Sequence, residues 1–323
     1  MSSPNVPNGS SSSEKNYAYD LITLGETMWR LSPPGNTRLE AAHQLDIKLG
    51  GAEGNVAVGL ARLGKRTAWW SRLPDNAPGH HVANTLRSFG VDVSGVAWGG
   101  SRLGTYFVEF GSPPRPTQVI YDRANSAASE MTPADFDWSL LSKTRWLHLT
   151  GITPALSASC LETVRHAVKM AHEVGTPISL DLNYRTKLWT MDEARPIFDE
   201  LASQCTLVIA AARDGKALIG GDTPPNWVGR GLHRRWHTPT VIVTMGERGA
   251  SAFDGHDSYE APAYPVTIVD KIGAGDAFDV GLLCALMDGK SLEDALRYGN
   301  AVAALKMTMP GDLALVTHDE VER

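Results

Sequence analysis

The sequence predicts an α/β fold with a mostly parallel central sheet, and two observations lead to this prediction. Short apolar runs of strand length alternate with amphipathic segments of helical length. This alternation is typical of βαβ units, in which a helix crosses over between parallel strands. Residues 104–123 break the pattern, because they predict two strands joined by a turn rich in proline and glycine. We therefore expect a small second β-sheet beside the main body; an edge hairpin without a special role is the alternative.

The main elements follow from residue 18 onward. Residues 19–26 are predicted to form the first strand. A helix is predicted next, because apolar residues recur at helical spacing from Ala52 to Leu63 and Gly64 follows them. Another helix is expected after Thr190, which stands three residues before Glu193 as in a capping box. Further strands are expected at residues 66–73, 145–151, 177–184, 205–211 and 239–246, and a further helix at 156–175.

The second sheet is expected to draw on two parts of the chain. Residues 28–50 are extended and poor in helix signals, and residues 96–124 contain the hairpin. Residues 18–323 as a whole are predicted to form one domain. Residues 1–17 are rich in serine, proline and asparagine, so we expect this segment to be disordered.

Composition and charge argue against several classes of protein. The net charge of -6 disfavours a general nucleic-acid binder, which is normally basic. No apolar run approaches the ~20 residues that a membrane span requires, and the first residues lack the apolar core of a secretory signal. Cys160, Cys205 and Cys284 lie far apart with no CxxC pair, which fits a reducing compartment. We therefore expect a cytoplasmic protein without nucleic-acid or membrane partners.

Polar residues at the ends of the predicted strands are the first candidates for a functional site. Ligands of open α/β sheets bind beyond the carboxyl ends of the strands. The residues that follow the apolar runs are Gly25, Glu26, Thr150, Gly151, Asp181, Asn183, Arg185, Thr244 and Gly246.

One short segment carries a sharper chemical signal. Gly273, Ala274 and Gly275, which we call the glycine turn, stand directly before Asp276 at the start of an apolar helical run. The first N–H groups of a helix lack partners within it and favour an anion, which small residues allow to approach. A phosphoryl group in transfer is such an anion, and Asp276 is placed to accept a hydroxyl proton as a base. A simple turn with Asp276 as the N-cap is the alternative, and this segment alone does not separate the two.

A family resemblance bears on that choice. Residues 270–283 resemble the second signature of the ribokinase-like (PfkB) carbohydrate kinases, and residues 50–64, GGAEGNVAVGLARLG, resemble the first. The resemblance covers nearly all of residues 18–322. It implies a three-layer α/β sandwich whose second sheet is a lid, and transfer of phosphate from ATP, with Mg²⁺, to a sugar hydroxyl. Asp276 would be the catalytic base and the glycine turn the anion hole. We also expect a homo-oligomer formed through the lid.

Four segments resemble 2-keto-3-deoxygluconate kinases in particular, namely residues 50–55, 119–129, 148–157 and 180–189. This likeness implies phosphorylation of the C6 hydroxyl of 2-keto-3-deoxygluconate, and an arginine fork suits the carboxylate of such a sugar acid. Kinases for fructose, ribose or another keto-deoxy acid stay open as alternatives, as does a sugar-binding regulator without catalysis. The substrate contacts that the likeness implies are Gly51, Asn55, Tyr106, Tyr121, Arg123 and Arg185.

The nucleotide side rests on residues 243–253, which by themselves predict only a hairpin turn. They resemble the nucleotide-binding strand and turn of the family, so Thr244, Gly246 and Gly249 are expected near the ATP phosphates or ribose. The same resemblance places Asn300 beside the adenine, where a helix that merely packs is the other interpretation.

The chain departs from the family pattern in two places. Lys271 stands where threonine is frequent. The stretch Ala211-Ala212-Arg213-Asp214 replaces an Asn-x-x-Glu element that helps to organise magnesium and phosphate in the family. Asp214 is able to replace the glutamate, but the asparagine has no counterpart, so the sequence leaves the metal ligands unknown.

Overall fold

The computed structural model describes residues 17–220 and 223–323 of the chain. The segment predicted to be disordered, residues 1–17, lies outside the described residues except for Tyr17.

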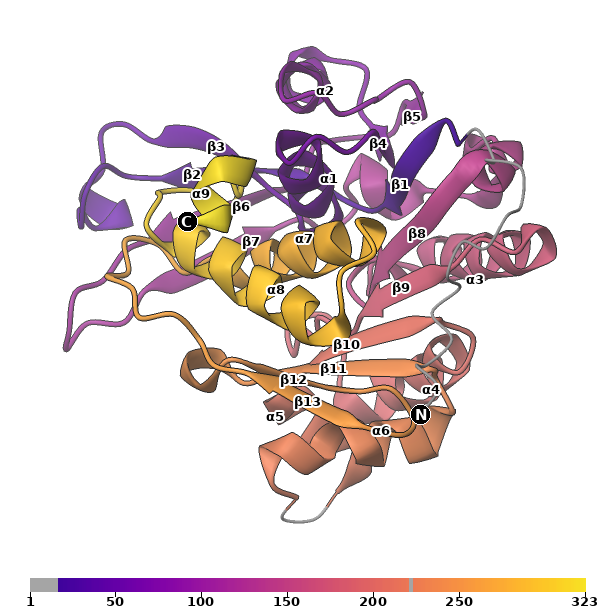
Figure 1. The fold of residues 1–323 in the computed structure, drawn as a ribbon. Coiled ribbons are helices and arrows are strands. Elements are labelled where there is room, and N and C mark those ends of the chain that lie inside the picture. Colours follow the sequence, from indigo (N-terminus) through magenta and orange to yellow (C-terminus); the bar gives the residue numbers. More distant parts are fainter. Residues whose placement is uncertain (1–16, 221–222) are drawn as a thin grey trace.

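The main body is built on one large sheet, drawn in Figure 1. Its strands run in the order β13-β12-β11-β10-β9-β8-β1-β4-β5. All neighbours from β5 to β11 pair in parallel, and β12 and β13 add an antiparallel edge. The prediction of a mostly parallel α/β sheet is thus confirmed. The strands are β1 (Tyr19–Leu24), β4 (Thr67–Leu73), β5 (Val96–Trp98), β8 (Thr144–Thr150), β9 (Ile178–Asp181), β10 (Leu207–Ala211), β11 (Thr240–Thr244), β12 (Ala250–Phe253) and β13 (Ser258–Ala261).

Helices cover both faces of this sheet and complete a three-layer sandwich (Figure 1). One face carries α1 (Ala52–Arg62), α7 (Ala274–Met287), α8 (Leu292–Met307) and the short α9 (His318–Glu322), with α2 (Ala77–Ser88) packed beside α1. The other face carries α3 (Ala158–Val174), α4 (Met191–Ala202), α5 (Ala212–Ile219) and α6 (Val228–Trp236). Short 3₁₀ helices lie in the connections, at Leu39–Ala41, Ala127–Glu130, Pro133–Asp135, Trp138–Lys143, Thr153–Ala155, Pro225–Trp227 and Gly246–Arg248.

Strand β1 shows why its sequence is apolar without alternation. Its side chains point alternately to the two faces, and both faces are covered by helices. Leu21 packs into the core under α7 and α8, whereas Ile22 packs into the core under α3, and both are fully buried. The predicted capping box is also present, since Thr190 and Glu193 exchange hydrogen bonds at the start of α4.

A second, four-stranded sheet, which we call the lid, confirms the prediction of a small separate sheet. Its order is β3-β2-β6-β7, with β2 and β6 parallel and the outer pairs antiparallel. The lid is smaller than predicted. Residues 96–98 fall in the predicted range but form β5, which pairs with β4 in the main sheet through Ser71 and Val96. The lid strands are β2 (Met28–Ser32), β3 (Asp46–Gly50), β6 (Thr105–Glu109) and β7 (Gln118–Asp122).

Candidate active site

A cavity of about 440 Å³ lies between the inner face of the lid and the carboxyl ends of the main-sheet strands. The lid contributes Met28, Tyr106 and Tyr121 to its lining, and the strand ends contribute Asp181 and Thr244. The glycine turn and Asp276 complete the lining at the start of α7. The cavity therefore lies at the edge where α/β sheets bind their ligands.

The glycine turn has a conformation that its sequence makes possible. Gly273 is the N-cap of α7 and adopts φ +84°, a left-handed conformation that favours glycine. A Cβ at this position would come within 2.3 Å of the carbonyl oxygen of Asp312. A Cβ at Gly275 would meet nothing within 4 Å, so the first turn of the helix is open to the cavity. An anion in the cavity therefore has access to the free N–H groups of this helix start.

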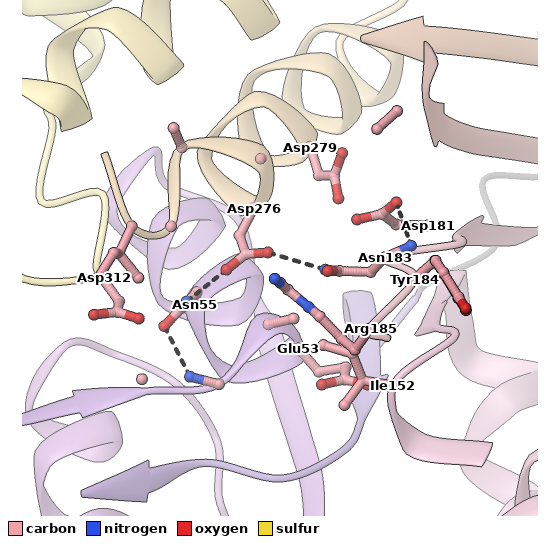
Figure 2. A pocket seen from close by; sticks show the side chains of 18 of the residues that line it. Glu53, Asn55, Ile152, Asp181, Asn183, Tyr184, Arg185, Asp276, Asp279 and Asp312 are labelled. Carbon is pink, nitrogen blue, oxygen red and sulfur yellow. Dashed lines mark hydrogen bonds between the residues drawn. The ribbon is translucent and has the colours of Figure 1, made fainter. Parts of the chain in front are cut away.

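Asp276 is held between two amides, as Figure 2 shows. Its Oδ2 accepts a 2.6 Å hydrogen bond from Nδ2 of Asn55 in α1, and its Oδ1 accepts a 3.4 Å bond from Nδ2 of Asn183 after β9. Asp276 lies in the first turn of α7, and Gly273 rather than Asp276 is the N-cap. The alternative of a simple capping aspartate is therefore wrong. The carboxylate faces the cavity with its orientation fixed by residues from two other segments.

Two further carboxyl groups lie beside Asp276, and both are buried. Burial and the nearby Asp276 raise the pKa of Asp181 to about 7. Asp279 follows Asp276 by one helical turn and is 1% exposed. Burial and the neighbouring carboxylates of Asp181 and Asp276 raise the pKa of Asp279 well above its usual range. Its Oδ2 has no hydrogen-bond partner among the described residues.

Glu53, in the first turn of α1, is another buried carboxyl in the cavity wall. Its Oε1 accepts hydrogen bonds from the hydroxyl groups of Thr150, at 2.7 Å, and Thr153, at 2.6 Å. Burial raises the pKa of Glu53 to about 7. Gly25 makes room for this carboxyl, because a Cβ there would lie 2.1 Å from the Cδ of Glu53. Glu53 and Asp279 were not predicted as site residues. Each is a charged residue among small or apolar helix residues, which is the one signal in the sequence that could have marked it.

The predicted substrate residues come together around the cavity. Tyr106 is 3% exposed, and its hydroxyl donates a 2.7 Å hydrogen bond to Oδ2 of Asp312. Tyr121 stacks on Tyr106 with ring centroids 5.6 Å apart. All six predicted substrate residues line the cavity, namely Gly51, Asn55, Tyr106, Tyr121, Arg123 and Arg185.

The two arginines differ in their partners. Arg123 donates a 2.8 Å hydrogen bond from Nε to Oε2 of Glu26, and the pair is almost completely buried. Arg185 extends into the cavity (Figure 2) and forms no salt bridge with the described residues. The two side chains were expected to act alike, and the structure separates them, because Glu26 already neutralises Arg123.

On the predicted nucleotide side, only Thr244 lies in the cavity wall. Gly246 and Gly249 lie in the short turn between β11 and β12, which is the predicted hairpin. Asn300 is buried in α8 and donates 3.0 Å hydrogen bonds from Nδ2 to the carbonyl oxygens of Ala261 and Pro262. Contact of Gly246, Gly249 and Asn300 with a nucleotide stays a prediction.

The stretch that departs from the family pattern borders the same cavity. Ala211, Arg213, Asp214 and Lys271 all belong to its wall. Arg213 donates a 3.0 Å hydrogen bond from Nε to Oδ1 of Asp214. Asp214 itself is buried, so its carboxylate is held at the cavity edge.

Over residues 17–220 and 223–323, no helix is long and apolar enough to cross a membrane.

Comparison with known proteins identifies the family. The profile described as "pfkB family carbohydrate kinase" matches residues 19–318. A 2-dehydro-3-deoxygalactonokinase of Haloferax volcanii is 44% identical over 305 residues, which cover 94% of this chain and 96% of that protein. A 2-dehydro-3-deoxygluconokinase of Bacillus subtilis is 33% identical and covers 91% of each chain. The crystal structure of a 2-dehydro-3-deoxygluconokinase from Thermotoga maritima is 35% identical, with a TM-score of 0.89 over 94% of this chain and 98% of that one. The chain therefore belongs to the pfkB family of carbohydrate kinases.

Proposed function

We propose that this kinase transfers the γ-phosphate of ATP to the C6 hydroxyl of 2-keto-3-deoxygluconate or of its galactonate epimer. The observation that carries the proposal is the position of Asp276, which faces the cavity beside the glycine turn, with the Arg185 side chain extending into the same cavity (Figure 2). Support for the sugar acid comes from the three relatives described above. They are named for 2-dehydro-3-deoxygluconate or 2-dehydro-3-deoxygalactonate, which are other names for the two 2-keto-3-deoxy acids proposed here.

The phosphoryl transfer assigns complementary roles to Asp276 and the glycine turn. The hydroxyl oxygen of the sugar forms a bond to the γ-phosphorus while the bond from that phosphorus to the bridging oxygen of ADP breaks. The hydroxyl proton passes to Asp276, which Asn55 and Asn183 orient for this task. The free N–H groups at the start of α7 donate to the phosphoryl oxygens, on which negative charge accumulates.

Mg²⁺ fits the carboxyl groups beside Asp276. Asp279 has a buried oxygen without a partner among the described residues, and Asp181 and Asp214 line the same cavity. The described residues hold no ready-made group of three metal ligands. This agrees with Mg²⁺, which commonly takes one or two carboxylates and completes its shell with water and substrate phosphates. Asp181 and Asp279 would hold the ion, which when bound neutralises charge on the triphosphate.

Arg185 is the proposed partner of the substrate carboxylate. It lines the cavity and has no salt-bridge partner among the described residues, so its planar fork is free to meet a carboxylate in a bidentate way. Arg123 has a different role in this proposal, because its pairing with Glu26 fixes the end of lid strand β7 against the main body.

Association of two copies through the lid is supported by an apolar row on its outer face. Ile47, Leu31, Phe107 and Ile120 are neighbours across the four lid strands by register, so their side chains share one face. Ile47 and Ile120 are each 49% exposed. We expect Ile47→Asp combined with Ile120→Asp to convert a wild-type oligomer to monomers in sedimentation-velocity experiments. A wild-type monomer, or an oligomer unaffected by both changes, would contradict this association.

The location proposed for the enzyme is the cytoplasm. All three cysteines are free and buried. Proteins of oxidising compartments usually pair their cysteines in disulfides, so free cysteines favour a reducing compartment such as the cytoplasm. Cellular fractionation with a compartment marker tests this point.

A panel of acceptors tests the proposed function. ATP-dependent formation of ADP is measured with 2-keto-3-deoxygluconate, 2-keto-3-deoxygalactonate, fructose and ribose, and the site of phosphorylation is read by ³¹P and ¹³C NMR. We expect both sugar acids to exceed the neutral sugars in kcat/KM, with phosphate on C6. A preference for fructose or ribose would reject the sugar-acid assignment and leave a carbohydrate kinase with a different acceptor.

A further inference from the structure

Lys306 is a buried charged residue to which the phosphoryl transfer described above assigns no role. It lies near the end of α8 with 0% of its surface exposed, although a lysine is almost never fully buried without a partner. Its Nζ donates a 2.8 Å hydrogen bond to the main-chain carbonyl oxygen of Asp270, three residues before Gly273. The ammonium group therefore sits directly behind the segment that leads into the glycine turn.

Every polar group of Asp270 forms a hydrogen bond, so the position of this residue is fixed. Its Oδ2 accepts hydrogen bonds from Arg30 of the lid, at 2.6 Å, and from the N–H of Gly311, at 3.0 Å. Its Oδ1 accepts a 3.0 Å bond from the N–H of Ile272, directly before the glycine turn. Its own N–H donates to the carbonyl oxygen of Met307 at the end of α8. The bond from Lys306 fixes the remaining polar group of Asp270, its carbonyl.

The other wall of the glycine turn belongs to the same ion cluster. Asp312, whose carbonyl oxygen a Cβ on Gly273 would strike, accepts a 2.5 Å hydrogen bond from Arg30. Arg30 and Lys306 carry two positive charges, and Asp270 and Asp312 carry two negative charges, so the cluster is balanced when all four are ionised. Loss of the lysine charge would leave one excess negative charge behind a site that must accept a phosphoryl anion.

We propose that Lys306 is a positioning residue for phosphoryl transfer, which holds the Asp270 carbonyl so that the glycine turn keeps its N–H groups aimed at the phosphate. Its positive charge also offsets the two carboxylates of the ion cluster, since its Nζ contacts Asp270 and Arg30 links Asp270 to Asp312. The inference rests on the proposed phosphate site at the glycine turn. It adds a residue on α8 that touches neither substrate and acts through Asp270.

Three variants of Lys306 separate its bond, its charge and its volume. Lys306→Met keeps most of the volume without either interaction, and Lys306→Gln keeps a donor for the Asp270 carbonyl without the charge. Lys306→Ala leaves a space that a small ammonium ion can enter. Val302→Ala is the matched control, since Val302 is fully buried one turn earlier on the same helix and carries no charge. Each protein is assayed with the acceptor that wild type uses best, so an error in the sugar assignment does not affect the result.

We expect Lys306→Met to lower kcat about 10- to 100-fold with less than about threefold change in KM for either substrate, because a displaced turn misplaces the reacting groups. Lys306→Gln should lose less. Methylammonium should restore kcat of Lys306→Ala in a saturable manner, and tetramethylammonium at equal ionic strength should not. Val302→Ala should be less stable but keep its kcat.

Several results would overturn the proposal. Wild-type kcat in folded Lys306→Met would do so, as would an equal loss in Val302→Ala or the absence of rescue by methylammonium. If the Met and Ala variants do not fold, Lys306→Gln decides, and an unchanged kcat rejects the role. An error in the proposed function itself, with Asp276 as its base, would appear separately, as near-wild-type turnover of Asp276→Asn.

Discussion

Asn55 in α1 donates a 2.6 Å hydrogen bond from Nδ2 to Oδ2 of Asp276 in α7, across 221 residues of sequence. This bond joins the two segments that resemble the family signatures. The first segment supplies the amide that orients the carboxylate supplied by the second. The proposed base is therefore part of a preorganised site rather than a freely rotating side chain.

Arg185 should select for the substrate carboxylate. Loss of one charged hydrogen bond costs roughly 1.5–3 kcal/mol, or about 10- to 150-fold in kcat/KM. Arg185→Ala should lose this factor with a sugar acid and change the poor use of fructose very little. Arg185→Lys should recover little, because an ammonium group cannot reproduce the fork. Steady-state kinetics with both acceptors checks the expectation, and equal losses with acid and neutral sugar would count against it.

Loss of Arg123 should lower the stability of the fold more than it changes the choice of substrate. Arg123→Ala leaves Glu26 buried without its partner, which should cost about 3–5 kcal/mol of the free energy of unfolding. The added change Glu26→Gln should return part of that loss. Arg102→Ala is the control, because the Arg102–Asp122 pair is exposed to solvent and should contribute little to stability. Urea unfolding of the four proteins gives the comparison, and similar losses for Arg123→Ala and Arg102→Ala would show that the buried pair has no special weight.

Glu53 should make stability depend on pH. Its pKa in the folded state is about 7, above the ordinary value of 4.5, so the folded protein binds more protons than the unfolded chain between these values. The free energy of unfolding should therefore fall as the pH rises from about 4.5 to about 7, by roughly 3 kcal/mol from this group. Glu53→Gln keeps an oxygen for Thr150 and Thr153 and removes the charge.

The free energy of unfolding of Glu53→Gln minus that of wild type gives the contribution of Glu53 alone, because all other titrating groups are the same in both proteins. The variant should gain on wild type as the pH rises from 5 to 8, in urea unfolding measured at fixed ionic strength. A difference that stays constant over this range would mean that Glu53 does not titrate there.

Much of the fold could be predicted from the sequence, because the periodicity of apolar residues reports directly on strands and helices. The boundary of the lid could not be predicted as well. Strand β5 has three residues, Val96–Trp98, and only its pairing with β4 shows that it belongs to the main sheet. A strand so short leaves no periodic signal that would separate it from the hairpin after it.

The candidate site was only partly accessible from the sequence, for a related reason. The glycine turn and Asp276 stand together in one segment with a recognisable conformation, so they could be found. Asp279 and Lys306 lie in helices whose burial is decided by distant parts of the chain. Their partners, Asp181 and Asp270, come from other elements, and no local pattern reports such contacts. The Arg123–Glu26 pair escaped prediction in the same way, since 97 residues separate its members.

The turnover of Asp276→Asn tests the central claim most directly. Asparagine keeps the shape of the side chain but cannot accept the hydroxyl proton, so kcat should fall by about 10²–10⁴ while the fold and ATP binding persist. Asp288→Asn is the control, because Asp288 is an exposed carboxylate at the other end of the same helix. ATP affinity by calorimetry, the unfolding midpoint and kcat are measured for both variants with the preferred acceptor. A folded Asp276→Asn that binds ATP and retains near-wild-type kcat would contradict the assignment of Asp276 as the base.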